Sequence, residues 1–218
     1  SKSRRNFLKK SGIIGTGVFI VPRHVLGGLG YTAPSDQLAL AAVGSGGKGR
    51  SDIENAYQNG KNRVVALCDV DPARAESSYK AHPRVNKYLD YREMLDDPSI
   101  DLIIITSHTD AHREHVLAAL KSGKKVYLDK PISVTLNDAL AIAEAERKTG
   151  NRLLMGFTRR YEASWIKMKE LLDGGAVGSL QMILLRAIIP YSRYLQGWHR
   201  KIEWSGGPLN DKCSHHFD

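Results

Sequence analysis

Cysteine and aromatic residues are scarce in this chain. Its 218 residues include only two cysteines, Cys68 and Cys213, which lie far apart and form no CxxC pattern. This spacing predicts neither a disulfide framework nor a zinc site. The net charge of +9 does not indicate nucleic-acid binding, because most of the excess is confined to the N-terminus.

Acidic residues are absent from the first 33 positions. This segment supplies six of the nine net positive charges, which leaves an ordinary +3 for the rest of the chain. Arg4, Arg5 and the following Phe-Leu-Lys precede an apolar run, Gly12 to Val21, that is too short to span a membrane. A basic region followed by a short apolar stretch is typical of a secretory signal, and the paired arginines resemble the twin-arginine signal.

We therefore predict that residues 1–33 are an export segment recognised by the twin-arginine machinery, with a solvated basic tail as the alternative. The protein would then be periplasmic, or anchored in the membrane and facing the periplasm. This route carries proteins that are already folded. It would suit a protein that acquires a nucleotide before it is exported.

Strand-like and helix-like segments alternate from Gln37 to Gly156. The strands expected from short apolar runs are 38–43, 63–68, 102–106, 126–128 and 152–155, and the helices expected between them are 49–58, a helix opened by Asp71-Pro72, 91–95, 111–122 and 137–149. Continuous apolar strands joined by helices through short connections indicate a parallel sheet with right-handed crossovers. The sequence predicts an α/β domain with a doubly wound parallel sheet over 34–156.

The pattern changes after Gly156. A helix is expected over 163–172, a long β-rich run covers 180–189, and the remaining residues are rich in aromatics and glycine. We expect 157–218 to begin a second α+β domain with a mostly antiparallel sheet. The chain is interpreted as a fragment of a longer protein or as a truncated product.

A glycine-rich loop follows the first predicted strand. Gly44, Gly46 and Gly49 form a GxGxxG pattern, and Ser45 and Gly47 complete the loop before a predicted helix. In this context the first glycine permits a tight turn, the second lets the backbone approach a pyrophosphate, and the third lets helix and strand pack closely. The helix N-terminus would face the phosphates.

A carboxylate stands at the end of the second predicted strand. Asp69 lies 20 residues after Gly49. At that position an acid accepts hydrogen bonds from the adenosine ribose hydroxyls and repels a 2′-phosphate. The sequence therefore favours NAD over NADP as the cofactor.

The sequence from Asp36 to Asp218 resembles the Gfo/Idh/MocA family of NAD(P)-dependent oxidoreductases, which have a Rossmann-type first domain. The resemblance depends on motifs that stand in family order: 66–71 (Ala-Leu-Cys-Asp-Val-Asp), His112 with His115, Gly123 to Val126, Asp129-Lys130-Pro131, Gly156-Phe157, Arg160-Tyr161, 206–211 (Gly-Gly-Pro-Leu-Asn-Asp) and His215. Asp129 replaces the family's usual Glu. Compared with the family pattern, we expect the second domain to be incomplete in this sequence.

The resemblance implies a catalytic set of Lys130, Asp211 and His215. Lys130 would lie beside the nicotinamide and stabilise a developing alkoxide. Asp211 and His215 are four residues apart and would share one face of a helix. His215, which ordinarily titrates near neutral pH, would take the hydroxyl proton, while Asp211 would orient the sugar and His215.

The resemblance also implies further binding residues. Beyond the loop and Asp69, the expected cofactor-binding residues are Thr106, His108, His112, Asp129, Lys130 and Pro131. Histidines such as His112 and His115 are more often helix-surface or capping residues; of the two, His112 is the one that matches the family. The expected substrate-binding residues are Arg160, Tyr161, Trp198 and Trp204, although the two tryptophans could simply pack.

The implied activity is hydride transfer between NAD and a hydroxyl carbon of a sugar, polyol or glycoside. The alternatives are an NAD-dependent glycosidase that uses transient oxidation and elimination, and a truncated non-catalytic nucleotide-binding protein. His215 and His216 with Asp211 and Asp218 suggest a zinc site as a minor alternative; the main interpretation includes no metal. The expected partners are a carbohydrate substrate and, for a full-length protein, further copies of the chain.

Overall fold

The computed structural model describes residues 32–150, 152–186, 188 and 197–218. Leu38–Asp218 forms one unit and Ser1–Gln37 another, of which only 32–37 are described, with a 3₁₀ turn at Pro34–Asp36. The predicted export segment, 1–33, therefore lies outside the described residues except for its last two positions. No helix among the residues described is long and apolar enough to cross a lipid bilayer.

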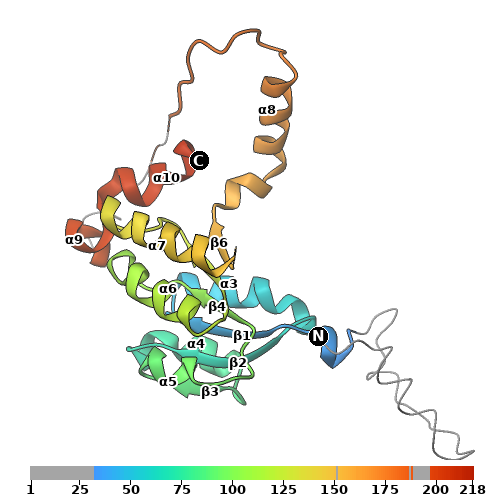
Figure 1. The fold of residues 1–218 in the computed structure, drawn as a ribbon, viewed down its shortest axis with the longest axis vertical. Coiled ribbons are helices and arrows are strands. Elements are labelled where there is room, and N and C mark those ends of the chain that lie inside the picture. Colours follow the sequence, from blue (N-terminus) through green and yellow to red (C-terminus); the bar gives the residue numbers. More distant parts are fainter. Residues whose placement is uncertain (1–31, 151, 187, 189–196) are drawn as a thin grey trace, which may run out of the picture. The chain divides into compact units, whose positions relative to one another are not determined.

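A six-stranded parallel sheet organises the second unit (Figure 1). Its strands, in the spatial order β3-β2-β1-β4-β5-β6, are β1 (Ala39–Val43), β2 (Arg63–Cys68), β3 (Asn86–Tyr88), β4 (Leu102–Ile105), β5 (Lys125–Asp129) and β6 (Leu153–Gly156). Every residue of β1 is buried, as expected for a central strand covered on both faces. The predicted doubly wound α/β fold is confirmed.

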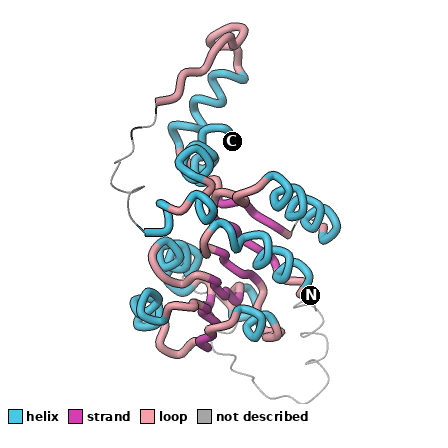
Figure 2. Tube along the Cα trace, turned by 90° about the vertical axis from the view of Figure 1, so that its left-hand side faces the viewer, coloured by secondary structure: helices cyan, strands magenta, loops and turns pink. Residues whose placement is uncertain are grey.

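Helices cover both faces of this sheet (Figure 2). They are α3 (Lys48–Tyr57), α4 (Pro72–Ala81), α5 (Tyr91–Leu95), α6 (His112–Lys121) and α7 (Leu136–Thr149). The larger core joins α5, α6 and α7 to one face through Met94, Val116 and Ile142. The smaller core joins α3 and α4 to the other face and centres on Ile53.

The strand register brings the carboxyl ends of the strands to one edge of the sheet. Val43 pairs with Cys68 on one side and with Ile105 on the other, and Asp129 pairs with Gly156. The strand order reverses between β1 and β4, because β2 follows β1 on one side and β4 lies on the other. Open α/β sheets bind their ligands at such a switch point.

The strand β3 was not expected from the sequence. Asn86–Tyr88 is a three-residue edge strand with an exposed start, and it pairs only with β2. It contains no apolar run, which is the signal that identified the buried strands. An edge strand with one polar face carries little of that signal.

The long strand expected over 180–189 is wrong for the residues that the structure describes. Residues 180–186 have no regular secondary structure, and their side chains are exposed; 187 and 189 lie outside the described residues. A strand needs a neighbour to pair its backbone groups, and no described strand pairs with this segment. The expected antiparallel sheet is therefore not formed by the described part of 157–218.

Helical segments make up the rest of the described C-terminal region. They are 3₁₀ turns at Thr158–Tyr161 and Gly197–Arg200, α8 (Ala163–Asp173), α9 (Ile202–Ser205), a π-helical turn at Leu209–Cys213 and α10 (Ser214–Phe217). The helix expected over 163–172 is confirmed as α8. The single helix expected to carry Asp211 and His215 is instead a π-helical turn that continues into α10. Cys68 is buried and Cys213 is half-buried, and the structure forms no disulfide between them.

Candidate active site

The glycine-rich loop lies between β1 and α3, as predicted. Gly44 has a φ of +85°, and a Cβ built on it would lie 2.7 Å from the backbone nitrogen of Ser107. A Cβ on Gly49 would lie 1.9 Å from the carbonyl oxygen of Gly44 and 2.6 Å from Thr106 Oγ1. Thr106 Oγ1 itself donates to the Gly44 carbonyl at 2.6 Å. The loop is therefore built for close backbone packing against β4.

The second glycine of the motif, Gly46, was expected to let the backbone approach a pyrophosphate, and in the structure it also lies against α4. A Cβ on Gly46 would lie 2.7 Å from the carbonyl oxygen of Arg74 in α4. Gly46 therefore allows the loop to approach α4. Ser45 is fully buried, and its hydroxyl donates to the Cys68 carbonyl at 3.1 Å, so this side chain fixes the loop to β2 rather than facing a ligand.

Asp69 holds the loop from the end of β2. Its Oδ2 accepts a hydrogen bond from the backbone N–H of Gly46 at 3.0 Å, and its Oδ1 accepts one from Asp71 N–H at 3.0 Å. Each carboxylate oxygen has two acceptor positions. Asp69 can therefore keep its hydrogen bond to the loop and still accept hydrogen bonds from ribose hydroxyls.

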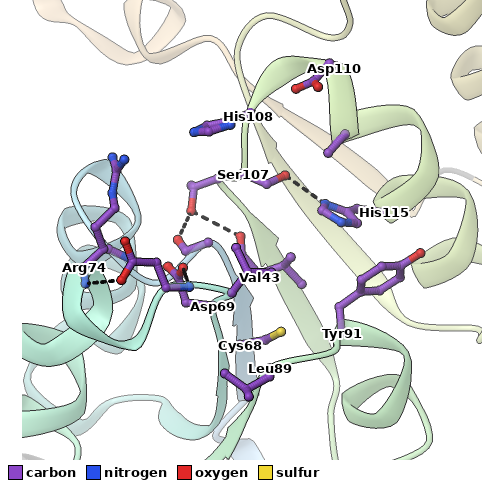
Figure 3. Close-up of a pocket in the computed structure, with 16 residues that line it drawn as sticks. Val43, Cys68, Asp69, Arg74, Leu89, Tyr91, Ser107, His108, Asp110 and His115 are labelled. Atoms are coloured by element: carbon purple, nitrogen blue, oxygen red, sulfur yellow. Dashed lines mark hydrogen bonds between the residues drawn. The ribbon is translucent and has the colours of Figure 1, made fainter. Parts of the chain in front are cut away.

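A cavity of about 480 Å³ opens at this edge of the sheet (Figure 3). This volume lies within the range of small-molecule and cofactor sites. Five of the predicted cofactor-binding residues line it: Gly44, Gly46, Asp69, Thr106 and His108. Figure 3 shows Arg74 on one side of Asp69 and the pair Tyr91 and His115 on the other.

Arg74, Tyr91 and His115 line the cavity but were not predicted as ligand-binding residues. Arg74 lies in the first turn of α4, and its guanidinium is 3.8 Å from a Cβ built on Gly47. The helix start at Asp71-Pro72 was the available signal, because it places the following turn beside the loop. No sequence pattern indicated that Tyr91, the first residue of α5, would line the cavity.

His115 is an uncharged member of the cavity wall. Its Nδ1 is hydrogen-bonded to Ser107 Oγ at 2.8 Å, and its ring lies edge-on to Tyr91 with centroids 4.4 Å apart. Burial lowers the pKa of His115 from 6.5 to about 4. The tyrosine hydroxyl donates to Glu114 at 2.8 Å.

His112 does not line the cavity. It is 1% exposed, and its two ring nitrogens lie 2.8 Å from the Pro131 carbonyl oxygen and 3.1 Å from that of Ser107. Burial lowers its pKa. His112 therefore joins the segments that follow β4 and β5, and Pro131 contributes its carbonyl to this connection.

The predicted catalytic residues Lys130 and Asp211 meet at the end of β5. Lys130 Nζ donates to Asp211 Oδ1 at 2.9 Å and to the Asp211 carbonyl oxygen at 2.8 Å. The two side chains are only 12% and 4% exposed. A buried ion pair of this kind needs hydrogen-bonded partners, and the π-helical turn places both acceptors of Asp211 within reach of Lys130.

His215 lies within electrostatic range of Lys130. Burial and then the charge of Lys130 lower the pKa of His215 from 6.5 to about 4, so the expected titration near neutral pH does not hold in this geometry. Its Nδ1 is buried and has no hydrogen-bond partner among the described residues. Its ring lies edge-on to Phe157 at 6.2 Å. The imidazole is therefore uncharged at neutral pH, and its lowered pKa makes it a weaker base than a free histidine.

Asp129 is half-buried and interacts electrostatically with two lysines. Burial raises its pKa, while the charges of Lys48 and Lys130 oppose that rise. Lys48 also pairs with Asp52, whose second carboxylate oxygen is buried without a hydrogen-bond partner among the described residues. Asp129 does not line the cavity described above. Its contribution is to the charge balance around Lys130.

The expected substrate-binding residues do not gather at one site. Trp198 and Trp204 stack on His108 with ring centroids 5.1 and 5.4 Å away, so the packing alternative describes them. Arg160 forms an ion pair with Asp218, and Tyr161 is 68% exposed. Neither Arg160 nor Tyr161 lines the cavity.

The four residues of the zinc alternative also have separate surroundings. Asp211 contacts Lys130, Asp218 contacts Arg160, and the His216 ring lies 6.2 Å from that of Trp165. Among the described residues, no group of three or more metal-ligating side chains is arranged to hold an ion.

A comparison with known protein families shows which family the chain belongs to. Residues 38–157 match the family GFO_IDH_MocA, described as an oxidoreductase family with an NAD-binding Rossmann fold. The chain belongs to this family. The match spans the sheet from β1 to β6 and includes the glycine-rich loop, Asp69 and Lys130.

Several Gfo/Idh/MocA relatives are inositol dehydrogenases. The inositol 2-dehydrogenase of Salmonella typhimurium is 34% identical over 122 residues, which are 55% of this chain and 36% of the relative. The uncharacterized oxidoreductase YrbE of Bacillus subtilis is 28% identical over 182 residues, which are 84% of this chain and 52% of the relative. The chain spans about a third to a half of the length of these relatives.

Solved structures of the family share the fold. The myo-inositol dehydrogenase of Lactobacillus casei, in complex with NAD(H) and myo-inositol, has a TM-score of 0.62 and 32% identity over 66% of this chain and 43% of its own. A probable dehydrogenase from Thermotoga maritima has a TM-score of 0.59 and 30% identity over 65% and 42%.

The residues of the cavity fit an NAD-binding role. The glycine loop leaves backbone space that a Cβ would fill, the Asp69 carboxylate reaches the cavity, and α3 begins directly after the loop. A helix N-terminus and a carboxylate at these two positions complement the pyrophosphate and the ribose of the cofactor.

Proposed function

We propose that the protein is an NAD-dependent dehydrogenase that oxidises a secondary hydroxyl of a polyol, sugar or glycoside. The observation that carries this proposal is the contact of Lys130 Nζ with Asp211 Oδ1 at 2.9 Å, at the same sheet edge as the cofactor cavity. The inositol dehydrogenases among the relatives support the substrate class. The Asp69 carboxylate favours NAD over NADP, because it would repel a 2′-phosphate.

Lys130, His215 and Asp211 have separate roles in the proposed hydride transfer. NAD held by the glycine-rich loop and Asp69 would supply the acceptor for the hydride of the carbinol carbon. Lys130 stabilises the negative charge that develops on the oxygen of that carbon. We assign acceptance of the hydroxyl proton to the uncharged imidazole of His215, the role that the family motif implies for this residue. Asp211 holds the ammonium of Lys130 through both its carboxylate and its carbonyl oxygen.

The test is NADH formation with a panel of inositols, sugars and glycosides. Lys130→Met should lower the turnover of any accepted substrate by about 10²- to 10⁴-fold, because it removes an electrostatic contribution made in the transition state. The NAD-induced increase in melting temperature should persist. The exposed Lys121→Met is the matched control and should turn over normally.

Two results would contradict the proposal. Equal turnover by Lys130→Met would exclude this lysine from the chemistry. Release of an aglycone from a glycoside without accumulation of NADH would assign the protein to the NAD-dependent glycosidases instead.

We also propose that the protein is exported by the twin-arginine route. The support is Arg4-Arg5 followed by Phe-Leu-Lys and a short apolar run. Replacing both arginines with lysine should retain the protein in the cytoplasm, as measured by cell fractionation. Unchanged export of that variant would contradict the proposal.

We also propose that the full-length protein self-associates. Large apolar side chains are exposed on α8 and after it, among them Ile166, Leu171, Met182 and Leu184. Exposed apolar surface of this kind favours contact with another protein surface, and we expect a second copy to provide it in the full-length protein. Light scattering of the purified full-length protein should give a mass above that of one subunit; a monomer at all concentrations would contradict this.

A further inference from the structure

We propose that His199 is a positioning residue of this active site, which holds the Asp211 carboxylate from the side opposite Lys130. The inference rests on the proposed function. His199 was not among the residues that the sequence motifs indicated. It lies in the 3₁₀ turn Gly197–Arg200, 69 residues after Lys130 in the chain.

The first observation is the location of His199 beside Asp211. Its Nε2 lies 4.0 Å from Asp211 Oδ2, while Asp211 Oδ1 accepts from Lys130 at 2.9 Å. The Asp211 side chain is 4% exposed. A buried carboxylate is stable only with partners around it. At 4.0 Å the contact is longer than a hydrogen bond, and it is an ion pair only when His199 is protonated. Catalytic contacts that are long in a free enzyme often tighten when substrate binds.

The second observation is a stack of rings that fixes His199. Its imidazole stacks on Trp198, with centroids 4.0 Å apart and planes 27° apart. Trp198 stacks in turn on His108 at 5.1 Å, and Trp204 stacks on His108 at 5.4 Å. The ammonium of Lys201 lies 3.7 Å from the Trp204 ring centroid, as in a cation–π contact.

This stack connects the two halves of the site. His108 lines the cofactor cavity, and His199 lies beside the Lys130–Asp211 pair. A ring held by neighbouring rings loses few conformations when it makes a polar contact, so it can hold a partner group in one geometry. The segment that carries Trp198 and His199 is thereby positioned relative to the cavity wall.

Through Asp211, His199 affects the direction in which the Lys130 ammonium points. Lys130 stabilises the alkoxide only if its Nζ points at the reacting oxygen, and Asp211 Oδ1 determines that direction. Loss of the His199 contact at Oδ2 changes the set of groups that orient the carboxylate, so that Oδ1 shifts relative to Lys130 Nζ. A displacement of about 1 Å in a catalytic group can lower a rate by about 10²-fold. Cofactor affinity should not change, because Asp69 and the loop are untouched.

The kinetic test compares His199→Leu with His199→Gln. Leucine removes the polar contact and should lower kcat by about 10- to 100-fold with little change in the KM for NAD. Glutamine retains an N–H donor and should restore most of kcat. His216→Leu, in the same C-terminal region, is the control and should behave as the wild type. Equal losses in the leucine and glutamine variants would overturn the proposal, because they would indicate a purely structural role.

A second test does not depend on any substrate. In ¹⁵N NMR spectra of the imidazoles, Asp211→Asn should shift the ring-nitrogen resonances of His199 and leave those of His216 in place, while the NAD-induced increase in melting temperature is retained. Unchanged His199 resonances would overturn the proposal. If the wild type oxidises no carbohydrate but the His199 resonances shift, the proposed function fails and the contact itself stands.

Discussion

Three glycines of the phosphate loop face backbone atoms too closely for any side chain. Built Cβ atoms would lie 2.7 Å from the Ser107 nitrogen at Gly44, 2.7 Å from the Arg74 oxygen at Gly46 and 1.9 Å from the Gly44 oxygen at Gly49. These neighbours are backbone and cannot rotate away. The motif is therefore a steric requirement of the fold as well as a feature of the cofactor site.

Gly49→Ala should destabilise the protein by at least about 2 kcal/mol, although alanine favours helices by about 1 kcal/mol over glycine. The reason is the 1.9 Å approach to the Gly44 carbonyl oxygen. The measurement is chemical denaturation. Gly150→Ala, where nothing lies within 4 Å and φ is +76°, should cost about 1 kcal/mol from backbone conformation alone. Similar losses in the two variants would contradict the steric account.

His115 should make stability depend on pH. Its pKa is about 4 in the folded protein and ordinarily 6.5, so the unfolded chain binds the additional proton. Its contribution is complete above pH 6.5 and is lost as the pH falls towards 4, by up to about 3 kcal/mol. The free energy of unfolding of the wild type, measured by chemical denaturation, should therefore decrease more between pH 6.5 and pH 4 than that of His115→Asn. The control His216→Asn should follow the wild type; parallel curves for all three would refute the prediction.

At the scale of elements, α4 positions one wall of the cavity. Asp71 is its N-cap, and the carboxylate accepts from the backbone N–H groups of Ala73 and Arg74 at 3.1 and 3.2 Å. Arg74 lines the cavity in the first turn of this helix. The stability of that turn therefore affects both the fold and the site.

Asp71→Ala should lower the free energy of unfolding by about 1 kcal/mol, because two N–H groups at the helix start lose their acceptor. It should also weaken NAD binding, as measured by calorimetry. Asp173→Ala on α8 removes only a surface pair with Lys169 and should change stability by less than about 0.5 kcal/mol. An unchanged stability in Asp71→Ala would show that the cap contributes nothing.

The sequence predicted the buried elements well and the exposed ones poorly. Five strands were expected at or within one residue of the observed boundaries, because apolar runs between glycine and aspartate turns mark them. The edge strand Asn86–Tyr88 had no such run. The strand expected over 180–189 was inferred from composition alone, and its described part has no neighbouring strand to pair with.

At the scale of the whole molecule, the candidate site joins residues far apart in the chain. Lys130 and Asp211 are 81 positions apart, and their contact was expected only through the family resemblance. The cavity-lining Arg74 and His115, and His199 beside Asp211, were missed because their roles depend on tertiary packing. Local patterns locate a loop or a strand end, but they do not show which distant side chain will stack on His108.

A thermal melt with and without NAD and NADP tests the central claim of an NAD-dependent enzyme most directly. NAD at about a hundred times its Kd should stabilise the protein by about 2.7 kcal/mol, which raises Tm by roughly 5 to 10 °C. NADP should have a much smaller effect, because Asp69 repels the 2′-phosphate. A cooperative melt that neither nucleotide shifts would contradict the account.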